Sequence, residues 1–111
     1  MTSTVLALLL AAGSMQAENV NTARNAYLDC MSNFMRTSLE QRTEPPAFQT
    51  ALATHCDAQA DAFRAALIRH DARRGGTRAA SENDFRATRE EALQNTVERY
   101  RIYFTNNQNP N

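Results

Sequence analysis

Residues 30–56 read CMSNFMRTSLEQRTEPPAFQTALATHC, and this stretch, bounded by the only two cysteines of the chain, decides the fold. Apolar residues recur at spacings of three and four on both sides of the triplet Glu44-Pro45-Pro46, and such spacing is typical of amphipathic helices. The prolines end the first helix, because a residue that precedes proline is disfavoured in the helical conformation. The stretch therefore predicts a helical hairpin.

The same spacing continues outward and predicts three helices, over residues of about 20–42, 46–73 and 81–104. The sequence has no strand pattern and no internal repeat of the length seen in solenoids. We therefore expect an all-α fold, a small antiparallel three-helix bundle, in one domain of residues 18–104. The segment 105–111 is polar without apolar anchors and is predicted to be a disordered tail.

Capping signals accompany each predicted helix. An asparagine at position 19 or 21 can accept hydrogen bonds from the free N–H groups of the first helix. Gly75 and Gly76 follow the second helix, where glycine favours the left-handed residue that closes a helix. Ser81, with Asp84 three positions later, is expected to form the capping box of the third helix.

Cys30 and Cys56 both lie on the apolar face of their predicted helices. At about 1.5 Å per residue, they lie roughly 18 and 14 Å from the connecting loop, which matches to within about one turn. The sequence therefore predicts a Cys30–Cys56 disulfide. Closing a loop of this length stabilises the folded state by about 3.5 kcal/mol in the chain-entropy account, which is a large share for a domain this small.

Residues 1–17 differ from the rest of the chain. Residues 5–12 are a run of eight apolar side chains, too short to span a bilayer, and small and polar residues follow up to Ala17. This segment resembles a secretory signal peptide that is cleaved after Ala17. The alternative is an apolar first helix retained in the fold, since no basic residue precedes the run. Ser14 stands where a lipoprotein would carry its acylated cysteine, so we expect no lipid anchor.

Export places the mature chain in the periplasm or outside the cell, where two cysteines are expected to pair. Beyond the first seventeen residues the sequence contains no candidate membrane span. The formal net charge is zero, which gives no electrostatic basis for a nucleic-acid partner.

The arginines are unevenly placed along the chain. Between Arg64 and Arg89, seven arginines stand against three acidic residues, a net charge of +4, and the rest of the chain carries −4. Arg73, Arg74 and Arg78 gather at the predicted turn between the second and third helices, beside a helix N-terminus, where anions bind. These three are the candidate anion-binding residues. The alternative is that they only complement the helix dipoles.

Two other kinds of site receive less support. His55 and Cys56 are adjacent and diverge by about 100° on a helix, and no paired-ligand spacing involves Cys30 or His70, so no metal and no cofactor are predicted. A metal-binding or thiol-redox protein that uses the two cysteines and a histidine is the alternative function.

The carboxylate pairs Asp57/Asp61 and Glu90/Glu91 are predicted to be solvated, whereas acid–base chemistry needs a carboxyl in an apolar pocket. No catalytic residue and no enzyme activity are therefore predicted.

Met31 and Met35, beside Phe34, either pack in the core or form an adaptable apolar surface for a protein client. An apolar stripe that three helices leave uncovered would favour a homodimer. The sequence thus predicts an exported, non-enzymatic helical protein that acts by binding, either to a protein client or to an anionic envelope component.

Overall fold

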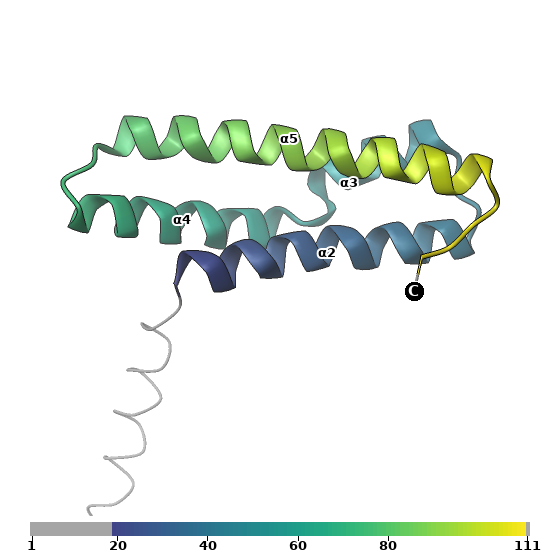
Figure 1. Cartoon of the computed structure of the whole chain (residues 1–111), viewed down its shortest axis with the longest axis horizontal. Coiled ribbons are helices and arrows are strands. Elements are labelled where there is room, and N and C mark those ends of the chain that lie inside the picture. The colour runs from purple at the N-terminus through teal and green to yellow at the C-terminus, as the bar shows by residue number, and fades with distance from the viewer. Residues whose placement is uncertain (1–18, 111) are drawn as a thin grey trace, which may run out of the picture.

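The computed structural model describes residues 19–110, which form four α-helices and no strand (Figure 1). The helices are α2 (Val20–Glu40), α3 (Pro45–His55), α4 (Asp57–Arg73) and α5 (Arg78–Thr105). The all-α prediction is confirmed. The predicted signal peptide, residues 1–17, lies outside the described residues.

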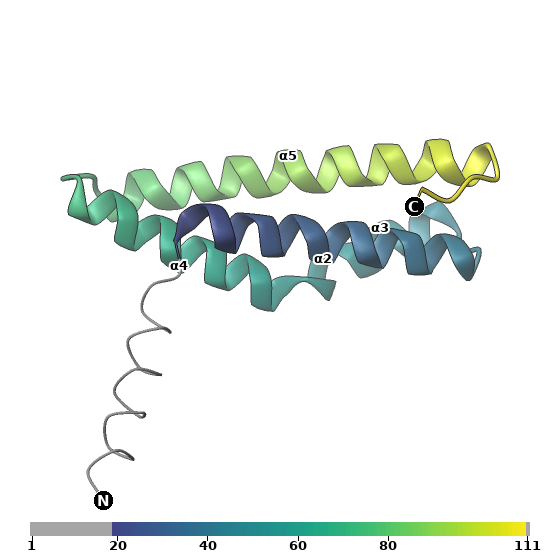
Figure 2. The same cartoon turned by 60° about the horizontal axis from the view of Figure 1, so that its bottom comes forward.

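The four helices form three rows (Figures 1 and 2). α2 makes the first row, α3 and α4 follow each other along the second, and α5 returns along the third. α2 and α5 therefore run in the same direction, and both are antiparallel to α3 and α4. The predicted disulfide is confirmed, since Cys30 of α2 is bonded to Cys56 with the two Cα atoms 6.0 Å apart.

The prediction of one continuous second helix is wrong, because the helix is interrupted at Cys56. This residue ends α3 and precedes α4, with φ −107° and ψ 27°. Its N–H is directed at the carbonyl of Thr54, so the regular helical bond pattern stops there. Residues 47–73 contain neither glycine nor proline, the residues that most strongly interrupt a helix. The break coincides instead with the residue that the disulfide attaches to α2.

The N-terminal caps agree with the sequence at one helix and not at another. Asn19 caps α2 by accepting a hydrogen bond of 2.8 Å from the N–H of Thr22, as predicted. At α5 the predicted capping box is wrong, because the cap is Thr77, whose hydroxyl accepts from the N–H of Ala80 at 3.1 Å. Ser81 lies one turn inside the helix and is buried; its hydroxyl donates to the Asp71 carboxylate at 2.7 Å.

Three helices end in the same way, with one left-handed residue followed by a hydrogen bond back to the last turn. The left-handed residues are Arg42, Gly75 and Asn107, with φ of 52°, 84° and 57°. Only the end of α4 uses the glycine that the sequence predicted. The bond after Asn107 runs from the N–H of Gln108 to the carbonyl of Tyr103 at 2.8 Å, and the disorder predicted for 105–111 stays a prediction.

The core runs the length of the bundle. Met31 and Met35 of α2 are each 1% exposed, which favours core packing over a client surface. At one end Phe48 of α3 stacks on Tyr100 of α5 with ring centroids 3.8 Å apart. The Tyr100 hydroxyl donates to the carbonyl of Thr43, at 2.6 Å, in the loop before α3. The aromatic pair therefore joins α5 to α3 and to the α2–α3 loop at once.

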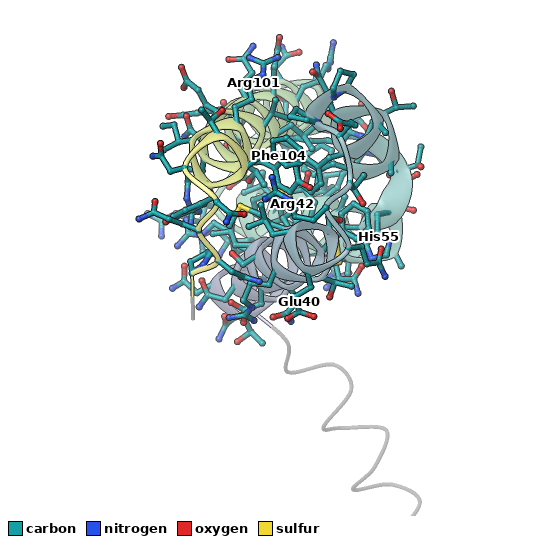
Figure 3. The ribbon with its side chains drawn as sticks, turned by 90° about the vertical axis from the view of Figure 1, so that its right-hand side faces the viewer. Glu40, Arg42, His55, Arg101 and Phe104 are labelled. Carbon is teal, nitrogen blue, oxygen red and sulfur yellow. A yellow bond between two sulfur atoms is a disulfide. The ribbon has the colours of Figure 1, made fainter. Side chains whose placement is uncertain are left out.

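Arg42 and Phe104 close the same end of the bundle (Figure 3). The Arg42 guanidinium lies 4.1 Å above the Phe104 ring and also donates to the Phe104 carbonyl at 3.3 Å. His55 and Arg101 point away from this contact, toward the sides of the bundle. Within residues 19–110 no helix is both long and apolar enough to cross a membrane.

Candidate anion-binding turn and disulfide groove

The three predicted anion-binding arginines lie together at the turn between α4 and α5. Arg73 is the last residue of α4, Arg74 follows it, and Arg78 begins α5. The turn is tight because Gly76 donates its N–H to the Asp71 carbonyl at 2.8 Å. A Cβ atom at Gly76 would meet that carbonyl oxygen at 3.1 Å, so a side chain there would push the turn open.

The three arginines differ in whether an acidic side chain pairs with them. Arg78 donates to Glu82 at 3.4 Å, and Arg64 of α4 is bonded to the same carboxylate. The hydrogen bond from Arg64 is the main cause that lowers the pKa of Glu82 below its usual value. Arg73 and Arg74 are exposed and form no ion pair with any residue in 19–110. Two of the three predicted residues are therefore free to bind an anion from solvent.

The turn also projects from the rest of the fold. In both Figure 1 and Figure 2 the α4–α5 end extends past the N-terminal end of α2, so two helices rather than three meet there. Arg69, one helical turn before Arg73, is also exposed at this end. An extended anionic surface could approach this end of the bundle without meeting α2.

A second charged site, which no sequence pattern predicted, lies at the break between α3 and α4. Arg89 of α5 donates to the carbonyl of Ala53 at 2.9 Å and lies 3.8 Å from the carboxylate of Asp57. The Tyr27 side chain faces the same group, and burial is the main cause that raises its pKa. Arg89 thus donates to the Ala53 carbonyl, which the break leaves without the backbone N–H that would bond to it in a regular helix. Asp57 and Arg89 are 32 positions apart, which hides this pairing from any local sequence pattern.

The disulfide borders an open groove between α2 and the α3–α4 junction, with a volume of about 540 Å³. Cys30 is half-buried and lines the groove, whereas Cys56 is 2% exposed. His55 also lines it, with its ring stacked 3.9 Å from that of Phe34. His70 is exposed on α4 and does not line this groove. The structure therefore brings one histidine, not both, to the side of the disulfide.

Other candidate groups do not converge. No cluster of three or more His, Cys, Asp or Glu side chains able to hold a metal occurs in residues 19–110. Asp57, Asp61, Glu90 and Glu91 are all exposed. A second groove, of about 400 Å³, lies between α3 and α5 over Leu52 and Val97.

Most of the apolar side chains that could have favoured a homodimer are buried in the core. Among the described residues, the large hydrophobic side chains that remain exposed are Leu28, 39% exposed, and Ile102, 55% exposed. They lie on different helices, α2 and α5. Dimer formation stays a prediction.

Comparison with protein-family models, with curated proteins and with solved structures finds no match for this chain.

Proposed function

We propose that this chain is an exported, non-enzymatic binding protein, and that Arg73 and Arg74 at the α4–α5 turn bind an anionic component of the cell envelope. The observation that carries the proposal is that both guanidinium groups are exposed at a projecting end of the bundle and have no acidic partner in residues 19–110. The Cys30–Cys56 disulfide is consistent with an oxidising, extracytoplasmic compartment.

Arg78 has a different role in this proposal. Its bond to Glu82 holds the side chain against the first turn of α5, where it supports the turn and adds positive potential. Exposed ion pairs of this kind contribute little to stability. Arg78 is therefore expected to increase the affinity for an anion less than Arg73 or Arg74 does.

The proposal favours an anionic component over a protein client because the free groups are charged. The methionines that could have formed an apolar client surface are buried. Arginine also suits phosphate and carboxylate groups, since its planar donors can bind two oxygens at once.

Vesicle binding tests the proposal directly. Phosphatidylcholine vesicles that contain phosphatidylglycerol should retain the oxidised protein, and pure phosphatidylcholine vesicles should not. Binding should weaken as salt is raised, because screening shortens the reach of surface charges. Added inorganic phosphate distinguishes the two sources of this chemistry, since it competes only if the site holds single phosphate groups.

The matched variants separate local contact from net charge. Arg73→Ala with Arg74→Ala should weaken vesicle binding by about tenfold or more, taking about 1 kcal/mol for each basic side chain near an anionic surface. Arg24→Ala with Arg99→Ala removes the same charge from exposed sites away from the turn and should change binding much less. Equal losses in the two pairs, or no loss in either, would show that the turn is not the binding site.

A further inference from the structure

The helix is interrupted at one of the two cysteines that form the disulfide. Cys56 is the single residue between α3 and α4, and its side chain is bonded to Cys30 of α2. Residues 47–73 lack glycine and proline and include nine alanines, the residue with the strongest helix preference, although residues 54–57 at the break are weaker helix formers. Intrinsic preference therefore favours one continuous helix through Cys56, and tertiary structure opposes it.

The two sulfur atoms differ in access. Cys30 lines the open groove beside Phe34 and His55, while Cys56 is covered, with 2% of its surface exposed. The groove has the volume to admit a small molecule, about 540 Å³. A reagent in the groove therefore meets Cys30, which lines it, and not Cys56, which does not.

We propose that the Cys30–Cys56 bridge is a site of thiol–disulfide exchange with small thiols, and that opening it allows α3 and α4 to join into one helix. This role is independent of anion binding at Arg73 and Arg74.

The exchange proceeds in two balanced steps. A small thiolate attacks Cys30 Sγ from the groove; a bond forms between the two sulfurs, the bridge breaks, and its electron pair remains on Cys56 Sγ as a thiolate. A second small thiolate then attacks the sulfur bound to Cys30, forming a small disulfide and releasing the Cys30 thiolate. Both protein thiolates take protons from solvent. Overall the bridge gains two electrons and two protons, and two small thiols are oxidised to one disulfide.

The position of Cys56 suits it to be the leaving group. It is the residue that precedes the first turn of α4, where backbone N–H groups lack helical acceptors and stabilise negative charge. The nearby carboxylate of Asp57 opposes this effect, but Arg89 lies 3.8 Å from it and offsets part of its charge.

Opening the bridge removes the covalent bond that holds Cys56 to α2 at the break. In a continuous helix the N–H of Asp57 would donate to the carbonyl of Ala53, four residues earlier. That carbonyl now accepts from Arg89 at 2.9 Å. Once Cys56 is released, the backbone bond can form, and Arg89 can remain beside the Asp57 carboxylate.

Amide hydrogen exchange on the oxidised and the reduced protein tests the coupling. If the bridge only stabilises the fold, amide hydrogen exchange around Cys56 should become faster after reduction. The proposal predicts the opposite: the amides of Cys56 and Asp57 should exchange about tenfold more slowly once helical bonds protect them. The double variant Cys30→Ser with Cys56→Ser should match the reduced protein. Unchanged or faster exchange at these amides, or loss of the whole fold on reduction, would overturn the coupling.

Glutathione exchange tests access to the groove. The mixed disulfide, trapped with acid and located by peptide mass, should be on Cys30. Asn33→Trp fills the groove and should slow exchange by about tenfold, because exchange rates depend on access to the attacked sulfur. The control Asn25→Trp places the same side chain on an exposed part of α2 that does not line the groove. An adduct on Cys56, or equal rates in the two variants, would refute attack at Cys30.

Discussion

Replacing Tyr100 with phenylalanine removes one hydroxyl from the most buried aromatic contact in the bundle. Tyr100 has no exposed surface, its ring stacks on Phe48, and its hydroxyl donates to the Thr43 carbonyl at 2.6 Å. Phenylalanine keeps the stack and loses only the hydrogen bond. A neutral hydrogen bond contributes about 0.5–1.5 kcal/mol net. Because Thr43 is half-buried, water can partly replace the lost donor, so we expect a loss of about 1 kcal/mol.

The same hydroxyl makes the loss depend on pH. Burial is the main cause that raises the pKa of Tyr100 above its ordinary value of 10.0. A folded-state pKa above the unfolded one means that the neutral hydroxyl stabilises the fold fully below about pH 10 and less as pH rises through the folded pKa. The wild-type protein should therefore lose more stability than Tyr100→Phe in this alkaline range. Tyr27, whose pKa is also raised by burial, is present in both proteins and cancels in the comparison.

Urea unfolding at about pH 7 and about pH 11 measures both effects. At neutral pH the variant should be about 1 kcal/mol less stable, and the gap should narrow at alkaline pH. Tyr103→Phe is the control, because Tyr103 is half-buried and its hydroxyl makes no hydrogen bond to residues 19–110; its effect should be within about 0.5 kcal/mol. If wild type and Tyr100→Phe differ in free energy of unfolding by the same amount at both pH values, the pH dependence does not come from the Tyr100 hydroxyl.

Three further variants test the caps and the interhelical contacts by thermal or urea unfolding. Thr77→Ala should cost about 1 kcal/mol through loss of the α5 cap, whereas Asp84→Ala should change stability by less than about 0.5 kcal/mol; the reverse order would support the capping box instead. Arg89→Ala should cost about 1 kcal/mol, because the Ala53 carbonyl loses a charged donor at a partly exposed site; no loss would show that water replaces the guanidinium. Arg42→Gly should be more stable than Arg42→Ala by about 1 kcal/mol, since both lose the Phe104 contact but only glycine relieves the left-handed conformation; equal stabilities would contradict that account.

Much of the fold follows from the spacing of apolar residues. The three-to-four rhythm places Tyr27, Met31 and Met35 on one face of α2, and all three are buried. The same rhythm places Cys30 and Cys56 at compatible heights, and the bridge forms. These predictions succeed because helix periodicity is a local property of the chain.

The features that escaped prediction depend on contacts between distant residues. Cys56 breaks a segment with high helix preference, and the break coincides with a bond to a residue 26 positions away. Ser81 and Thr77 are both good capping residues, and Ser81 instead packs inside the bundle against Asp71. The arginine cluster lies at the predicted turn, but which arginines lack a partner depends on Glu82, which pairs with both Arg64 and Arg78.

Both bridged cysteines lie on the N-terminal side of the α4–α5 turn, so the disulfide does not tie α5 to the rest of the chain. α5 is covalently attached to the other helices only through residues 74–77, an exposed segment that follows Arg73 and contains both Arg74 and Gly75-Gly76. A protease that cleaves after arginine would find there an exposed site next to the two glycines. After one cut, α5 with Tyr100 would be held to the other helices by noncovalent contacts alone.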